Sequence, residues 1–519
     1  MALNPPAPMD YPFSPASCLP PELLIKIFEC LVRHSRSNPT PLLQVCHRWA
    51  DIASSVSDLW STIDFSSPPE PLLQRCADRP IEVILSSSPT EPAWDKRRAA
   101  KRVLLLYSGR IRKLVLDLPA CHLQEIERGL SATFPTLVEI SISIAHDHHE
   151  DFDPEDFPEW SPVAIPSSSI RHLKLLLVKT PWTLGRFQNL VEFFLHDQQY
   201  ADHDPPMEVF LGILESSPQL TTLSVANAGP RLPLDTPTLP PATRVIHLPN
   251  LQHLYFEQVD ACDIGWMLIH LEIPESANVR IFVDYGGRTD APLEPILDLV
   301  LPNHPGFPHL TDLPRCTYAV NFEPSCVITA HNFALRISWN NGMRRHFDCF
   351  MMPFLRRTAG AIEDLTVIHD QPTRYSTTTI QWDQIFGTLR FLRKLRVEQS
   401  PGEPDFSIWS VFKSSPCPLL RDLRLSFLAF GKEPRRKGDG RNQRRLVERL
   451  VDYCAEGIQR GYRLNSLVIE APGDPPPGLA SLLTPYADHV EIREEFLSDE
   501  GVWDLEFGSR HVFDSLPSV

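Results

Sequence analysis

The chain has 519 residues, a length that predicts two to four domains or one long repeat array. Its 42% hydrophobic and 22% charged residues are ordinary for a globular protein, although the net charge is −16. The 52 prolines, spread among short apolar runs, predict many short elements and argue against long helices. No apolar run reaches the roughly 18 residues that a membrane span needs, and the segment before Leu19 lacks the features of a signal peptide.

The eleven cysteines form no C-x-x-C pair and have no regular spacing. Several of them, such as Cys30, Cys46, Cys262 and Cys454, stand beside apolar residues, where a free thiol packs as a small hydrophobic group. We therefore expect a reducing compartment, the cytosol or the nucleus.

The first predicted element is a helix over residues 19–32, LPPELLIKIFECLV. Two prolines open it, as a first helical turn tolerates, and an acidic residue comes next, at the positive end of the helix dipole. Its apolar side chains form a stripe wider than a third of the circumference: Leu23, Leu24, Ile27, Phe28 and Leu31, with Cys30 and Val32.

A second helix is predicted from Thr40, as its cap, to Val56, with Pro41 in its first turn. A short third piece, SDLW at residues 57–60, leads into STIDF, which is typical of the start of a strand. The apolar stripes are wider than three short helices can cover among themselves, and such an exposed remainder usually marks an interface. The alternative is that the helices pack on the rest of the chain.

This pattern, L-P-P-E-L-L-x-x-I-F-x-x-L, then L-L-x-V-C-x-x-W-x-x-I-A, then L-W, resembles the F-box found in many fungal proteins. The resemblance covers residues 19–65, after a tail (1–18) that we expect to be disordered. It implies docking on the Skp adaptor of SCF-type cullin–RING ubiquitin ligases. The adaptor-binding residues that it implies are Leu19, Pro20, Glu22, Leu23, Ile27, Leu31, Leu43, Val45, Cys46, Trp49, Leu59 and Trp60.

After residues 66–110, predicted to be a linker and the first repeat elements, a phrase apolar-x-x-apolar-x-apolar recurs ten times. Its fourth and sixth places alternate like a half-buried strand, and its first place fills the preceding turn. Repeats of this kind bury their apolar faces only by stacking on neighbours. The ten copies begin at residues 111, 137, 170, 190, 220, 251, 362, 392, 420 and 464.

The repeats look like leucine-rich repeats, which predicts an α/β repeat fold: a three-helix F-box followed by an irregular solenoid over residues 111–519. The Asn or Cys that regular repeats carry after the last apolar residue is absent, and 257–361 offers only the partial matches NVRIFV and FALRIS. Helices are expected at LESSPQL, DQIFGTLRFL and RRLVERLVDYCAEGIQRG. A β-sandwich or a propeller is the alternative, and the intervening helical segments disfavour both.

The fifth place of each phrase should face solvent, where aromatic and arginine side chains are frequent binding hot spots. Four such residues are therefore predicted to contact a protein target: Phe194, Tyr255, Arg396 and Arg424. The alternative is that they pack under loops.

Residues 390–445 hold 14 Lys or Arg against 6 Asp or Glu, inside an acidic chain. Such a segment can hold an acidic or phosphorylated partner, because arginine pairs with phosphate through two parallel hydrogen bonds. A nuclear-import signal, an RNA contact or simply a solvated loop would look the same, and nucleic acid is not an expected partner.

The stretch AHDHHEDFDPEDFPEW at residues 145–160 has histidines and acids that metals bind, but its prolines and acidity are typical of a surface loop. The sequence holds no G-x-S-x-G, phosphate-loop or H-E-x-x-H motif. We therefore expect no metal, no cofactor and no catalytic residue.

Three hypotheses remain. The first is a substrate receptor of an SCF-type ligase that tethers a target and does no chemistry itself. The second is an F-box scaffold that works outside a ligase. The third is a metal-dependent hydrolase within residues 257–361.

Overall fold

A computed structural model describes the chain in segments. They are residues 19–35, 39–65, 68–86, 94–119, 134–144, 169–178, 187–197, 204–232, 241–259, 261–274, 276–284, 315–320, 325–330, 333–338, 362–369, 389–399, 419–426, 450–452, 454–459, 461–471 and 478–494, with a few single residues between them. Within these segments, no helix has both the length and the apolar character needed to cross a bilayer.

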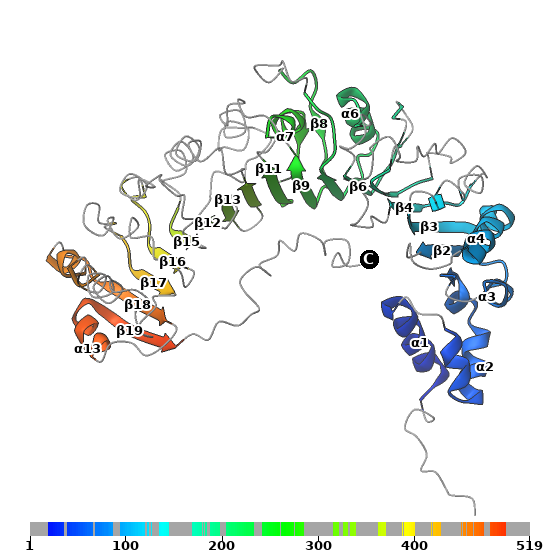
Figure 1. The fold of residues 1–519 in the computed structure, drawn as a ribbon, viewed down its shortest axis with the longest axis horizontal. Coiled ribbons are helices and arrows are strands. Elements are labelled where there is room, and N and C mark those ends of the chain that lie inside the picture. Colours follow the sequence, from blue (N-terminus) through cyan, green and yellow to red (C-terminus); the bar gives the residue numbers. More distant parts are fainter. Residues whose placement is uncertain are drawn as a thin grey trace, which may run out of the picture. The chain divides into compact units, whose positions relative to one another are not determined.

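The chain divides into two compact units, Met1–Pro230 and Arg231–Val519. The first unit begins with a helical head, residues 19–65, whose described residues form two α-helices and two 3-10 helices. These are α1 (Pro21–Ser35), η2 (Thr40–Gln44), α2 (His47–Ser55) and η3 (Ser57–Trp60). Figure 1 shows α1 and α2 of this head.

The helical head differs from the prediction at its second helix. The helix breaks at Val45 and Cys46, so that a 3-10 helix and a separate α-helix replace one continuous helix. Pro39, and not Thr40, is the N-cap of η2, and no side chain caps it. Cys46 is extended, with φ −164° and ψ 165°, and its carbonyl oxygen accepts the N–H of Ala50 at 3.0 Å. The break leaves Val45 exposed while Leu42 is buried.

The rest of the first unit is a parallel sheet whose strands are neighbours in chain order, β1 to β7. Helices lie beside it, namely α3 (Glu70–Arg75), α4 (Trp94–Tyr107) with η4 (Ser108–Arg110), and α6 (Met207–Glu215) (Figure 1). The strands are β1 (Thr62–Ile63), β2 (Ile81–Ser86), β3 (Ile111–Leu118), β4 (Glu139–Ile144), β5 (His172–Leu176), β6 (Glu192–His196) and β7 (Thr222–Ala226).

The described residues of the second unit form three groups of strands. β8 (Ile246–His247) pairs with β10 (Leu271–Glu272). A second group joins β9 (His253–Val259), β11 (Asn278–Asp284) and β14 (Phe333–Ser338) in parallel and adds β13 (Ser325–Ala330) antiparallel to β14. The third is an all-parallel, six-stranded sheet: β12 (Arg315–Val320), β15 (Asp364–His369), β16 (Lys394–Gln399), β17 (Asp422–Ser426), β18 (Leu464–Ala471) and β19 (Ala487–Glu494).

Helices of the second unit include α7 (Ala261–Leu268), α13 (Leu479–Leu483) and the 3-10 helix η9 (Thr484–Tyr486). Residues 454–459, inside the predicted RRLVERLVDYCAEGIQRG helix, are also helical. LESSPQL is the end of α6 and the turn after it, rather than a separate helix.

All ten repeated phrases form strands, in β3 to β7, β9 and β15 to β18. The first apolar residue of each phrase is buried, from Ile111 at 0% exposure to Leu464 at 6%. The partial matches NVRIFV and FALRIS lie in β11 and β14. Neighbouring parallel strands with helices between them exclude the β-sandwich and the propeller for the described residues, because both of those folds are built from antiparallel sheets.

Candidate docking site

Helix α1 has two apolar faces. Leu24 and Phe28 are fully buried, whereas Leu23, Ile27 and Leu31 are 46%, 40% and 49% exposed. Both sets have a spacing of four residues, so that each forms a row along the helix. The buried row holds the helical head together, and the exposed row lies outside it.

The break before α2 also leaves apolar residues of the helical head exposed. Val45 is 57% exposed, and Cys46 is exposed beside it. Cys30 on α1 is also exposed, although we expected both of these cysteines to be packed. We call the exposed Leu23, Ile27, Leu31 and Val45 the head surface.

The interior of the helical head is aromatic. The rings of Phe28 and Trp49 lie 4.9 Å apart and tilted by 59°. The indole Nε1–H of Trp60 donates to the carbonyl oxygen of Ala53 at 2.8 Å. Leu59 and Trp60 are 2% and 0% exposed, so they belong to the core of the head and not to its surface, where the resemblance placed them.

The remaining predicted docking residues are exposed or half-buried. Pro20 and Glu22 are exposed, while Leu19, Leu43 and Trp49 are half-buried. The carbonyl oxygen of Pro20 accepts the N–H groups of Leu23 and Leu24, which fixes the first turn of α1. Arg48 Nη2 donates to the carbonyl oxygen of Leu19 at 2.5 Å, and the sequence did not suggest this contact between α2 and the start of α1.

The helical head is joined directly to the sheet of the first unit. Thr62 and Ile63 pair with Glu82 and Val83 in β2, and the N–H of Glu82 donates to the carbonyl oxygen of Ser61 at 2.9 Å. The Arg75 guanidinium of α3 lies 4.5 Å from the centroid of the Trp60 ring, where a cation is attracted to the ring face.

Among the predicted target-contacting residues, Phe194 is not where we expected it. It is only 4% exposed, and the Nζ of Lys174 lies 4.5 Å from its ring centroid. On the same face, His196 is 7% and Ser224 is 2% exposed, and His196 Nε2 is 2.8 Å from Ser224 Oγ. This face of β6 and β7 is buried, so Phe194 offers little surface to a partner.

Burial and the positive charge of Lys174 lower the pKa of His196 to about 4. The imidazole is therefore neutral at pH 7, and one of its nitrogens shares a hydrogen bond with Ser224. The pair is buried and polar, with the character of a structural contact.

Charges alternate across the neighbouring row of the first sheet. Lys113 Nζ lies 3.0 Å from Glu139 Oε1, and His172 Nδ1 lies 3.3 Å from Glu192 Oε2. The hydrogen bond from His172 lowers the pKa of Glu192, against the effect of burial, and Lys174 adds to it. Because positive and negative groups alternate, this row presents no single-sign surface.

In the second unit, Tyr255 is half-buried and its hydroxyl donates to Glu257 Oε2 at 2.5 Å. Arg396 and Arg424 stand opposite each other on β16 and β17, and both are half-buried. The basic loop at 432–445, like the histidine-rich stretch at 145–160, lies outside the described residues.

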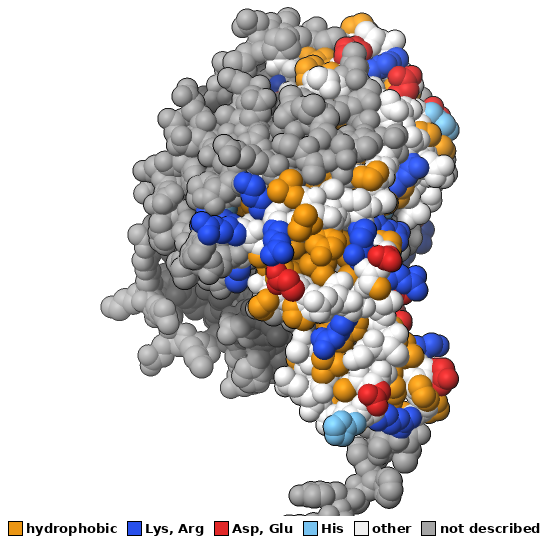
Figure 2. Space-filling model, turned by 90° about the vertical axis from the view of Figure 1, so that its right-hand side faces the viewer, with side chains coloured by type: hydrophobic (Ala, Val, Ile, Leu, Met, Phe, Trp, Pro, Cys, Tyr) orange, Lys and Arg blue, Asp and Glu red, His pale blue; other side chains and the backbone are white. Residues whose placement is uncertain are grey.

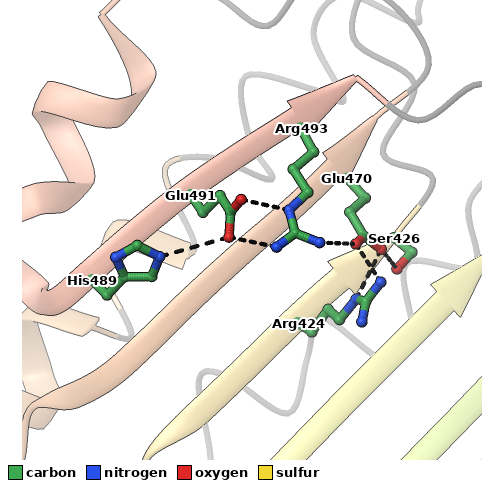
Figure 3. Close-up of polar contacts among 6 residues, drawn as sticks. All are labelled: Arg424, Ser426, Glu470, His489, Glu491 and Arg493. Carbon is green, nitrogen blue, oxygen red and sulfur yellow. Dashed lines mark hydrogen bonds and ion pairs between the residues drawn. The ribbon is translucent and has the colours of Figure 1, made fainter.

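Arg424 is part of an ion-pair network that crosses three strands (Figure 3). Its Nε donates to Glu470 Oε2 at 2.9 Å, and its Nη2 donates to the other oxygen of the same carboxylate. Ser426 donates to Glu470 Oε2 at 2.6 Å, and Arg493 Nη1 lies 3.8 Å from Glu470 Oε1. Glu470 is 2% exposed, so a buried carboxylate largely neutralises the charge of the half-buried Arg424.

The network continues along β19, where Arg493 donates twice to Glu491, at 2.6 and 2.7 Å. His489 Nε2 lies 3.6 Å from Glu491 Oε2. Burial raises the pKa of Glu470, but hydrogen bonds from Arg424 and Ser426 outweigh this effect and hold the pKa below its usual value. The network is a structural bracket across the end of the sheet rather than an open anion site.

In the part of the chain that the structure describes, no group of three or more His, Cys, Asp and Glu side chains is arranged to hold a metal ion. Burial raises the pKa of the Cys417 and Cys454 thiols to about 12, so neither is a ready nucleophile.

Residues 16–66 match the family model described as F-box-like. The whole helical head lies within this match, so an F-box-like domain occupies the start of the chain. No curated protein matches the chain.

Proposed function

We propose that the chain is the substrate-recognition subunit of an SCF-type cullin–RING ubiquitin ligase. The observation that supports this most is the division of α1 into a sealed face and an open one. Leu24 and Phe28 complete the head, whereas Leu23, Ile27 and Leu31 remain exposed on it. The F-box-like match at residues 16–66 favours the Skp adaptor as the protein that covers the open face.

In this proposal the parallel strands form a leucine-rich-repeat-like array of the kind found in fungal F-box proteins. Asn227 supports it, because it comes two residues after Val225, has φ 47°, and donates from Nδ2 to Asp197 Oδ1 at 3.0 Å. A turn asparagine is thus present after β7, where we had expected none. Wherever the side chain is described, the first, fourth and sixth places of the phrases are buried, as stacked repeats require.

The mechanism is tethering without chemistry in this chain. The adaptor would hold the helical head, and the repeat strands would hold a protein target near the ubiquitin-charged enzyme. Tethering raises the effective concentration of a target lysine and so lowers the entropic part of the activation free energy of ubiquitin transfer. We propose the cytosol or the nucleus as its location, because that is where this machinery works.

The experiment is co-expression with the Skp adaptor, followed by copurification. Leu23→Asp and Ile27→Asp each place a charge on the head surface, and each should weaken adaptor binding by at least about thirtyfold, as for a hot-spot residue worth about 2 kcal/mol. Leu482→Asp is the matched control, because Leu482 lies on α13 in the second unit and is 48% exposed, as Leu23 is 46% exposed. Unchanged adaptor binding by both head variants contradicts the proposal.

A scaffold that works outside a ligase would still bind the adaptor. Recovery of the cullin in the same purification separates the two functions: a receptor brings the cullin with the adaptor, and a scaffold does not. A stoichiometric metal found in the pure protein would instead support the hydrolase hypothesis.

A further inference from the structure

Helix α4 of the first unit carries a second exposed apolar site, at a distance in sequence from the helical head. Leu105 is 49% and Leu106 is 64% exposed, in consecutive positions near the end of the helix. Ala100, Val103 and Leu104 are buried on its other side, and Figure 1 shows α4 beside β2 and β3. The exposed leucines are therefore not part of the contact that holds α4 in place.

Basic residues precede these leucines on the same side of α4. At 100° per residue, Arg98, Lys101, Arg102, Leu105 and Leu106 fall within about 140° of the helix circumference, opposite the buried residues. We call these five residues the α4 surface. The side of the molecule that carries α4 faces the viewer in Figure 2, where hydrophobic side chains gather among Lys and Arg side chains.

The charge of α4 is strongly positive within a chain whose net charge is −16. The helix has five basic residues and one acidic residue, Asp95. Arg102 makes a weak ion pair: its Nη1 lies 3.8 Å from Glu70 Oε1, with the two side chains 70% and 54% exposed. Arg102 therefore keeps most of its capacity to pair with a carboxylate from another molecule.

We propose that the α4 surface binds an acidic segment of another protein in which apolar side chains follow the acidic ones. The basic group is centred near residue 100 and the leucines near residue 105, which at 1.5 Å per residue is about 8 Å along the helix. An extended peptide covers that distance in two or three residues. The ligand would thus place carboxylates or phosphates two or three residues away from a leucine or an aromatic side chain.

A protein segment fits the surface better than an anionic membrane does. An anionic bilayer presents phosphates over a broad face, so the exposed Glu70 carboxylate beside Arg102 would repel it. A peptide can pass beside Glu70 and still reach both the cations and the leucines. The inference does not depend on adaptor binding, because the α4 surface and the head surface share no residue.

The test uses the full-length chain without the adaptor and a fluorescent synthetic peptide with four aspartates, a Gly-Ser spacer, and then Leu-Phe. We expect saturable binding by fluorescence anisotropy that weakens as salt rises. The double variant Arg98→Glu/Arg102→Glu should weaken binding by at least tenfold, and so should Leu105→Ser/Leu106→Ser. Leu482→Ser, an equally exposed leucine in the second unit, is the control and should bind as the natural chain does.

Binding of the peptide with asparagines in place of the aspartates at equal strength would overturn the proposal. Binding to phosphatidylserine vesicles but not to the peptide would also overturn the proposal. A dimer of the chain that depends on α4 and forms without the peptide would overturn it as well. Adaptor copurification is measured on the same variants. It should be unchanged, and its loss in both α4 variants would show that the two surfaces are not independent and would also overturn the inference.

Discussion

The helical head and the parallel strands depart from the usual inside–outside rule in opposite directions. The head keeps Leu23, Ile27 and Leu31 outside, although each belongs to a regular apolar row. The strands seal the apolar rows of their phrases and also bury polar groups, among them His196 and Glu470. The two regions use similar residues at similarly regular spacing, so spacing alone does not say whether a row faces the chain's own core or another protein.

The comparison also separates two kinds of cost. An exposed apolar row costs the folded chain little, but it creates a surface that a partner can cover. A buried polar group must be paired, because an unpaired one costs about 1–3 kcal/mol. The exposed row therefore leaves the head with surface for association, whereas the paired polar groups of the strands contribute to stability.

The largest expected effect comes from truncating one leucine in each region to alanine. Leu173→Ala in β5, a fully buried position, should lower the free energy of unfolding by about 2–5 kcal/mol. Leu23→Ala in α1 should change it by no more than about 0.5 kcal/mol, because the side chain already contacts water. Urea denaturation of the full-length chain measures both changes. An equal loss of stability in the two variants would mean that Leu23 is buried against other residues of the same chain.

A smaller effect concerns pH and the buried His196. The folded state binds the imidazole proton only near pH 4, while the unfolded chain binds it near 6.5, so the unfolded state takes up more protons between these values. Stability should be complete above pH 6.5 and should fall by about 3 kcal/mol as the pH drops to 4. His196→Gln should remove most of this dependence of stability on pH between 4 and 6.5, as measured by thermal melts. An unchanged pH dependence would contradict the assignment to His196.

The smallest effect distinguishes the buried end of the ion-pair network from its exposed end. Glu470→Ala leaves Arg424 and Ser426 without their shared acceptor and should cost about 1–3 kcal/mol. Glu491→Ala is the control on β19, and it should change stability less because that carboxylate is 35% exposed, against 2% for Glu470. Amide hydrogen exchange in β17 and β18 reports both changes.

The same carboxylate predicts the direction of the acid limb. Since the pKa of Glu470 is held low in the folded protein, its contribution is present above the usual carboxyl pKa and disappears as the pH falls through the folded value. Glu470→Gln should therefore be less sensitive to pH below about 4 than the natural chain. An identical acid limb would assign the sensitivity to other groups.

The strands were predictable because each phrase carries its own signal. Each phrase, as in I111-RK-L114-V-L116, begins with an apolar residue that packs in the preceding turn. Its alternating apolar residues at the fourth and sixth places then predict a half-buried strand, whatever the neighbouring segments contain. The short β1 lies in STIDF, which was expected to begin a strand, but its pairing with β2, such as Thr62 with Glu82, depends on residues elsewhere in the sequence. The antiparallel β13 carries no such phrase, and its pairing with β14, which brings Ala330 opposite Phe333, was not predicted.

The candidate site was predictable only in part. The apolar rows of α1 were evident, but nothing in the residue types separates Leu23, which is exposed, from Leu24, which is buried. Leu59 and Trp60 match the family pattern and are core residues, since a pattern records identity and not burial. Phe194 was misplaced for a similar reason: alternation predicts which face a side chain is on, but not whether that face is covered.

The join after Trp60 contains no spacer that can change length. The last residues of the head form β1, the first strand of the sheet. Thr62 and Ile63 pair with β2, and the carbonyl oxygen of Ser61 accepts a hydrogen bond from Glu82 in that strand. Two molecules held by the head and by the first strands would thus keep one separation and one mutual angle. A Gly-Ser insert after Trp60 would break the pairing of β1 and turn that single geometry into a broad distribution of distances.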